Sequence, residues 1–144
     1  MKHILPTLAL VSALALTGCS TSVGVDNPDN SSASYAGGSL TTTYKSDVST
    51  VFAATKRALD GARDLNILGR VGETEEDRSA EGELSGVTVF ARAIGDVRVT
   101  VKIARATDAV TGADCTEVTV RWGLLGNCQQ SQQIVHRITQ NLGR

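Results

Sequence analysis

Three segments in the second half of the chain alternate apolar and polar residues with a period of two. They span residues 87–92, 97–103 and 116–122, and valine and threonine are frequent in each. Successive side chains of a β-strand point to opposite faces of a sheet, so this pattern predicts strands with one buried and one exposed face. The short link Ile94-Gly95-Asp96 between the first two segments predicts a hairpin. The chain is therefore expected to contain an antiparallel sheet.

Segments with helical spacing lie on either side of these strands. Residues 48–65 place apolar side chains every three or four positions, and Ser46 or Asp47 can cap the start of the helix. Residues 128–142 repeat this pattern, with Asn127 as the capping residue. Each segment is predicted to be an amphipathic helix whose apolar face packs against the core.

Two further segments complete the expected fold. Residues 40–44 and 67–73 predict extended structure, whereas the acidic stretch 73–83 predicts a solvated turn. The expected order of elements is β-α-β-β-β-β-α. Strands grouped into hairpins, with helices at both ends, favour the α+β class: an antiparallel four- to five-stranded sheet with two helices packed on one face.

The N-terminus carries a signal of a different kind. Lys2 and His3 precede an apolar stretch of about thirteen residues, which is shorter than the roughly 20 residues of a membrane-spanning helix. The stretch ends in Leu16-Thr17-Gly18-Cys19, which resembles the lipobox of bacterial lipoproteins. Residues 1–18 are therefore predicted to be a signal peptide, cleaved between Gly18 and Cys19. The alternative is an ordinary secretory signal with a cysteine near its cleavage site.

The lipobox resemblance implies that Cys19 carries a diacylglycerol and anchors the mature chain to a membrane. Residues 19–39 are rich in serine, glycine and asparagine and are predicted to form a flexible tether after the lipidated cysteine. Residues 40–144 are expected to form a single α+β domain. Ser20, in place of aspartate, resembles the sorting preference for the outer membrane, which predicts a domain facing the periplasm.

Charge and composition argue against several classes of function. A net charge of −1 and an aromatic content of 3% provide neither a basic surface nor a stacking platform for nucleic acid. The glycine-rich run 82–86 lacks the Lys-Ser/Thr pair of a phosphate-binding loop. We therefore expect no nucleic-acid partner and no cofactor.

Catalytic and metal-binding residues are sparse. His136 is the single histidine beyond the predicted cleavage site, and a hydrolase would need it beside Ser131 or acidic residues. A zinc site needs three or four clustered ligands, and the acidic stretch lacks the spacing of a calcium loop, so no metal site is predicted. The chain is expected not to be an enzyme.

Two cysteines beyond Cys19 leave two interpretations open. In an exported protein Cys115 and Cys128 favour a disulfide. A straight strand over residues 116–122 would, however, separate them by roughly 23 Å, whereas a disulfide allows about 7 Å between Cα atoms. A bridge therefore requires residues 123–127 to fold back along the strand, and otherwise Cys128 is a buried free thiol.

The strands also define a possible partner surface. One set of side chains is expected to face the helices: Val97, Val99, Val101, Ile103, Val118, Val120 and Trp122. The opposite face would then carry four basic residues, Arg92, Arg98, Lys102 and Arg121, among threonines. These four could contact carboxylates of a cell-wall polymer or an acidic envelope protein. The alternative is a plain solvated face whose charges prevent association.

The domain resembles a family of small bacterial lipoproteins known as domain of unknown function 3568. The resemblance rests on the order of Leu40–Tyr44, Ala58-Leu59, Asp77–Gly82, Val118–Arg121 followed by Gly123 and Gly126, and a closing helix with Ser131, Ile134, Ile138 and Leu142. Asn127 stands where the family commonly has aspartate, and both residues cap helices. The resemblance implies an envelope location and this fold class, and it supplies no catalytic residue.

These features together predict a lipid-anchored bacterial envelope lipoprotein that acts as a non-enzymatic interaction or structural module. Its expected partners are the membrane, through Cys19, and an envelope protein or cell-wall polymer. One alternative is a periplasmic carrier with a small-ligand cavity beside the alanines of the first helix, Ala53, Ala54, Ala58 and Ala62. The other alternative is a hydrolase built around His136.

Overall fold

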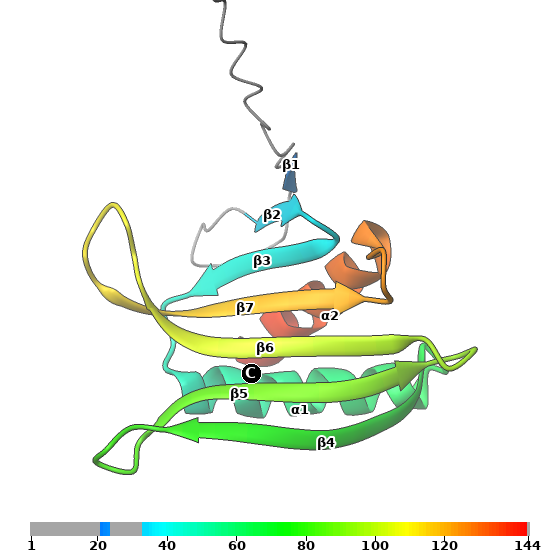
Figure 1. The fold of residues 1–144 in the computed structure, drawn as a ribbon, viewed down its shortest axis with the longest axis horizontal. Coiled ribbons are helices and arrows are strands. Elements are labelled where there is room, and N and C mark those ends of the chain that lie inside the picture. Colours follow the sequence, from blue (N-terminus) through cyan, green and yellow to red (C-terminus); the bar gives the residue numbers. More distant parts are fainter. Residues whose placement is uncertain (1–20, 24–32, 144) are drawn as a thin grey trace, which may run out of the picture.

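The computed structural model describes residues 21–23 and 33–143, and its strands form one antiparallel sheet (Figure 1). The elements are β1 (Thr21–Val23), β2 (Ala33–Ala36), β3 (Ser39–Tyr44), α1 (Val48–Asp64), β4 (Leu68–Arg78), β5 (Leu84–Ala93), β6 (Arg98–Thr107), β7 (Asp114–Trp122) and α2 (Cys128–Leu142). Across the sheet the strands are ordered β1-β2-β3-β7-β6-β5-β4. Both helices lie on the same side of the sheet, here called the covered face, and the other side is the open face. The predicted α+β class is confirmed.

Side-chain caps begin both helices, as the sequence predicts. Of the two candidates for α1, Asp47 is the cap, and its carboxylate accepts a hydrogen bond from the Thr50 backbone nitrogen at 3.2 Å. The Asn127 side chain accepts one from the Gln130 backbone nitrogen at 3.0 Å at the start of α2. These oxygens satisfy amide groups that have no partner within a helix.

The hydrophobic core lies between the covered face and the helices. Five of the strand residues expected there are fully buried: Val99, Val101, Ile103, Val118 and Val120. The helices contribute Val51, Ala54, Ala58, Leu59, Ile134 and Ile138. Val97 differs from the expectation and is 36% exposed, because it precedes β6 and lies in the turn after β5. Trp122, at the end of β7, is half-buried.

A buried tyrosine ties α2 to the sheet. Tyr44, the last residue of β3, hydrogen-bonds through its hydroxyl to the Thr139 hydroxyl at 2.9 Å. The same hydroxyl donates to the backbone oxygen of Val135 at 3.4 Å. A buried phenol needs a hydrogen-bond partner, and here the partners lie on the helix that covers the strand.

The sheet has more strands than the four or five expected. Residues 33–122 contribute six, because β2 precedes β3 within the range predicted to be tether. Tyr35 pairs with Leu40 across a turn at Gly37 and Gly38, and Ala33 is fully buried. β2 has only four residues, Ala-Ser-Tyr-Ala, which are too few to show the period of two from which a strand is predicted. The sheet therefore begins before Leu40, whereas Cys19 and most of residues 19–32 lie outside the described residues.

The acidic stretch also differs from its prediction. Residues 73–78 continue β4, and the turn is confined to residues 79–83. β4 lies at the edge of the sheet, where most of its side chains are exposed on both sides. An edge strand that buries little loses the period of two, so the run of glutamates resembles a loop in the sequence.

Candidate functional site

Three arginines lie side by side on the open face. Arg98 of β6 pairs with Arg92 of β5, and Arg92 pairs with Arg70 of β4. Neighbouring strands are about 4.8 Å apart, so three cations share one row across three strands. Their placement follows from the alternation of β5 and β6, which directs valines and alanines to the core and the arginines to the open face.

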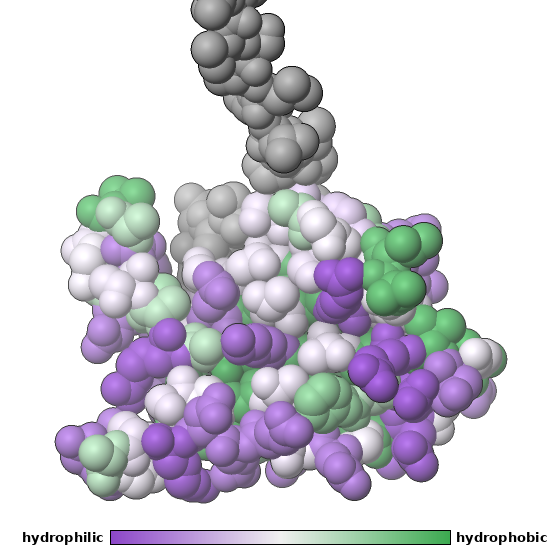
Figure 2. All heavy atoms as spheres, viewed as in Figure 1, coloured by the Kyte–Doolittle hydropathy of each residue, from purple (hydrophilic) through white to green (hydrophobic). Residues whose placement is uncertain are grey.

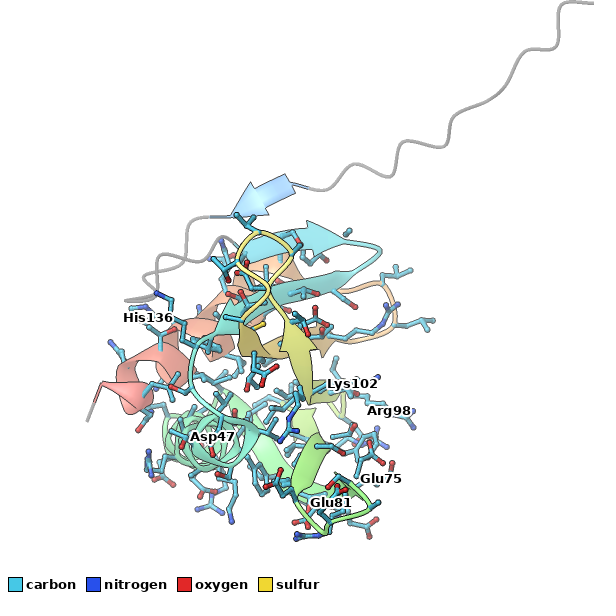
Figure 3. The ribbon with its side chains drawn as sticks, turned by 90° about the vertical axis from the view of Figure 1, so that its left-hand side faces the viewer. Asp47, Glu75, Glu81, Arg98, Lys102 and His136 are labelled. Carbon is cyan, nitrogen blue, oxygen red and sulfur yellow. The ribbon has the colours of Figure 1, made fainter. Side chains whose placement is uncertain are left out.

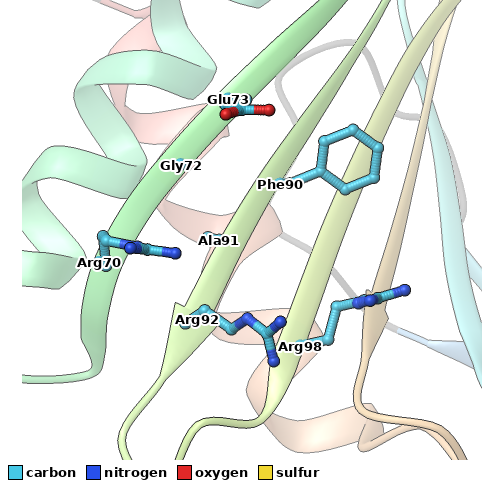
Figure 4. Close-up of a pocket in the computed structure, with 7 residues that line it drawn as sticks. All are labelled: Arg70, Gly72, Glu73, Phe90, Ala91, Arg92 and Arg98. Carbon is cyan, nitrogen blue, oxygen red and sulfur yellow. The ribbon is translucent and has the colours of Figure 1, made fainter.

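The arginine row borders a shallow pocket of about 480 Å³ (Figure 4). Phe90, which is half-buried, and Glu73 line the same pocket. Glycine is required at residue 72, because a Cβ atom there would lie 2.9 Å from the backbone oxygen of Phe90. The pairing of β4 with β5 shifts register on this stretch, which bends the edge strand beside the pocket. We refer to these residues together as the arginine pocket.

The positive charge of the arginine pocket is only partly compensated. Arg92 forms an ion pair with the Asp96 carboxylate at 3.5 Å and donates to the Asp96 backbone oxygen at 3.1 Å. Among the described residues no carboxylate lies within ion-pair distance of Arg70 or Arg98. Like charges in one row repel, and an anion that enters the pocket relieves that repulsion. Guanidinium groups bind carboxylates and phosphates through paired hydrogen bonds, so these arginines are suited to an anionic ligand.

The structure separates the four predicted partner residues into two groups. Arg98 and Lys102 point away from the helix layer, on which Asp47 and His136 lie (Figure 3). Lys102 pairs with Thr88 and Thr119 one row from the arginine pocket and is exposed. The fourth residue, Arg121, holds loops together. It donates to the backbone oxygens of Gly37 (2.9 Å) and Leu124, so its guanidinium is already occupied.

Arg70 is the member of the site that sequence reasoning missed. The sequence predicts extended structure over 67–73 but gives that segment no face, because glycines at 69 and 72 interrupt the alternation. Pairing with Arg92 then decides which way Arg70 points. A search for arginines beside a predicted Arg-x₅-Arg hairpin could have found it as a candidate, but the register shift between Leu68 and Arg70 is not readable from the sequence.

The residues considered for hydrolysis are not brought together. Ser131 is fully buried on the core-facing side of α2, whereas His136 of the same helix is exposed and contacts Gln140 at 2.9 Å between nitrogen atoms. Ser131 and His136 are five residues apart, which places their side chains on different faces of α2. Of the alanines considered for a carrier, Ala54, Ala58 and Ala62 are packed in the core, and Ala53 is exposed.

Both cysteines of the domain are free thiols in the structure. Cys115 lies near the start of β7, and Cys128 begins α2 beyond the other end of that strand. Burial raises the pKa of the Cys115 thiol, and the carboxylates of Asp108, Glu117 and Asp114 raise it further. A thiol that stays protonated is a poor nucleophile and a poor metal ligand. Cys128 is half-buried rather than fully buried.

The described part of the chain lacks both a metal-ligand cluster and a membrane-spanning helix. Within residues 21–23 and 33–143, no group of three or more histidine, cysteine or acidic side chains is arranged to hold a metal ion. Over the same residues, neither helix has the length and apolar character needed to cross a membrane.

The domain is thus an α+β protein with a helix-covered sheet and an arginine pocket on the open face. Residues 2–141 match a family described as a protein of unknown function (DUF3568), and the chain belongs to this family. The resemblance noted in the sequence is therefore confirmed. No curated protein matches the chain. Because Cys19 lies outside the described residues, its lipidation stays a prediction.

Proposed function

We propose that this protein is a lipid-anchored bacterial envelope lipoprotein whose domain is a non-enzymatic module that binds an anionic partner. The lipobox-like run before Cys19 supports the anchor, and two acyl chains give stable rather than reversible membrane binding. The proposed location is the outer membrane, with the domain facing the periplasm. The candidate partners are an acidic envelope protein or a carboxylate-bearing cell-wall polymer.

The register of Arg70, Arg92 and Arg98 is the observation that carries the binding role. Their row lies on the face that the helices leave open, so a partner reaches it without any rearrangement of the core. Lys102 adds a further cation two open-face rows beyond Arg98, next to the row of Phe90 and Thr100. Phe90 adds an apolar contact beside the cations, a combination that suits a ligand with a carboxylate next to carbon-rich groups.

Crosslinking in intact cells tests the binding role. A variant with Arg98→Glu and Lys102→Glu is expected to lose the partner that the unaltered protein captures, because both substitutions place carboxylates on the open face. Lys56→Glu is the matched control, since this exposed residue lies on α1 in the helix layer. Unchanged capture by the double variant, or an equal loss with the control, contradicts the proposal.

Membrane fractionation tests the anchor separately. Cys19→Ser removes the thiol that would receive the diacylglycerol and leaves every described residue unchanged. The variant is expected in the soluble fraction after the membranes are washed with high salt, with unaltered thermal unfolding. Recovery of the washed variant with the membranes to the same extent as the unaltered protein contradicts lipid anchoring.

A further inference from the structure

Two adjacent leucines are almost fully exposed in the loop between β7 and α2. Leu124 is 85% exposed and Leu125 is 88% exposed. Large apolar side chains this exposed lose the free energy of burial, and contiguous apolar patches on soluble domains commonly mark interaction sites. The position of these two leucines therefore needs an explanation beyond folding.

The loop that carries the leucines is held firmly. Arg121 donates to the backbone oxygen of Leu124, and a Cβ atom on Gly38 would lie 2.7 Å from the backbone oxygen of Leu125. Gly126 packs against Gly38 so closely that no side chain fits between them, and its φ of +83° favours glycine. The fold therefore fixes the loop and directs both leucines outward.

A second apolar pair lies at the same end of the molecule. Ile94 is exposed in the turn between β5 and β6, and Val97 follows it. Gly123 joins the two loops, because its backbone nitrogen donates to the Arg98 oxygen at 2.7 Å. A Cβ atom on Gly123 would lie 3.2 Å from a methyl carbon of Val97. Figure 2 shows apolar surface over both loops. We call Ile94, Val97, Leu124 and Leu125 the apolar rim.

Cationic and amphipathic residues lie directly beside the apolar rim. Arg92 and Arg98 flank the turn that carries Ile94 and Val97, and both belong to the arginine pocket. Trp122 immediately precedes the leucine loop and is half-buried. In a bilayer surface the acyl chains lie below a layer of anionic headgroups. Apolar side chains that enter the bilayer first, followed by arginines and a tryptophan at headgroup level, suit this arrangement.

We propose that the apolar rim is a membrane contact, in which the leucine loop enters the headgroup boundary of an anionic bilayer and Arg92 and Arg98 contact lipid phosphates. The proposal rests on the proposed function for the nearness of a bilayer, and it names lipid phosphate as an anion for the arginine pocket. A second copy of the chain is the less suitable occupant. A symmetric contact between two rims would bring the arginines of both copies together without added negative charge.

The test uses the chain from Ser20 to Arg144, which lacks the acyl anchor. Every core residue in the described part of the chain belongs to residues 33–142, so this chain retains all of them. It is mixed with vesicles of phosphatidylglycerol and phosphatidylethanolamine, and with vesicles of phosphatidylcholine alone. Sedimentation measures binding. The fluorescence of Trp122, the single tryptophan, reports transfer of this end of the domain to an apolar environment.

The unlipidated chain is expected to sediment with the anionic vesicles and to show a blue shift of Trp122. Leu124→Ser combined with Leu125→Ser is expected to weaken binding roughly tenfold or more, from the lost apolar contact. Arg98→Gln is expected to weaken binding about fivefold, and only on the anionic vesicles. Val110→Ser is the matched control, because Val110 is 95% exposed in the loop between β6 and β7, at the other end of the sheet.

Several outcomes would overturn the membrane contact. One is failure of the unlipidated chain to sediment with anionic vesicles, and another is an equal loss with Val110→Ser. A third is light scattering that shows a dimer which the leucine substitutions dissociate, without vesicle binding by the unaltered chain, since the rim would then join two copies. Thermal unfolding of each variant shows that the fold is retained. Failure here leaves the high-salt fractionation of Cys19→Ser unaffected, so the anchor and the rim are judged separately.

Discussion

The two faces of the sheet differ in the type and burial of their side chains, although the same strands form both faces. On the covered face β6 and β7 present valines and an isoleucine that the helices bury completely. On the open face the intervening residues of β6 include Arg98, Thr100 and Lys102, which the helices do not cover. The residues of the covered face hold the fold together, whereas the residues of the open face can be specialised for binding without disturbing the core. Stability and binding are therefore expected to respond to different substitutions.

The largest effect is expected from the covered face. Ile138→Ala removes a fully buried side chain at the contact of α2 with the core. Lost burial and the cavity left behind are expected to lower the free energy of unfolding by about 2–5 kcal/mol. Urea unfolding followed by circular dichroism measures the change. A loss below about 1 kcal/mol, within the usual range of surface substitutions, would remove the basis for the comparison.

The next largest effect on stability is expected where the loop before α2 packs against the turn between β2 and β3. Gly126→Ala forces a side chain against Gly38 in a backbone conformation that favours glycine. The substitution is expected to cost about 1–3 kcal/mol and to loosen the leucine loop. Thermal unfolding gives the cost. Gly112→Ala is the control for φ alone, because its φ is +71° but no atom lies within 4 Å of the added carbon.

A smaller effect is expected at the start of α1. Asp47→Ala removes the helix cap and is expected to cost about 1 kcal/mol at neutral pH. Hydrogen bonds from Ser49 and Thr50 lower the pKa of Asp47 below its ordinary value of 3.8. The carboxylate therefore stabilises the fold above pH 3.8, and this contribution disappears as the pH falls through the lower folded-state pKa.

Unfolding of Asp47→Ala and the unaltered protein at pH 7 and at decreasing pH checks this expectation. The difference between them should be constant near neutrality and shrink only in the acidic range. A difference that shrinks between pH 7 and pH 5 would assign the effect to another group.

The smallest effect on stability is expected on the open face. Arg98→Ala removes an exposed side chain that has no carboxylate at ion-pair distance among the described residues. The free energy of unfolding should change by less than about 0.5 kcal/mol. Capture of an anionic partner should nevertheless fall. A large loss of stability at this position would mean that the open face also maintains the fold.

The sequence predicts the parts of this protein that have strong periods. β5, β6 and β7 follow the alternation, and Asp47 and Asn127 cap the helices as their positions indicate. β2 is too short for a pattern, and the exposed edge strand β4 has lost its pattern. Both strands are defined by pairing with a neighbour, which is a tertiary property.

The candidate site could be predicted only in part for the same reason. Arg92, Arg98 and Lys102 lie on the open face, as the alternation indicates. Arg70 joins them through a register that bulges shift, and Arg121 is diverted to bind loop oxygens. The exposure of Leu124 and Leu125 depends on glycines far apart in the chain, Gly38 and Gly126, which pack against each other.

The edge strand β4 has a consequence wherever two copies of this protein come close together. A free edge offers unpaired backbone groups that can join sheets of neighbouring molecules into a continuous aggregate. β4 places Glu73, Glu75, Glu76 and Asp77 along that edge, and its pairing with β5 is interrupted by three register shifts. Carboxylates repel an approaching copy, and a bent edge does not match a straight one. The acidic, bent strand therefore opposes pairing of two copies through this edge of the sheet.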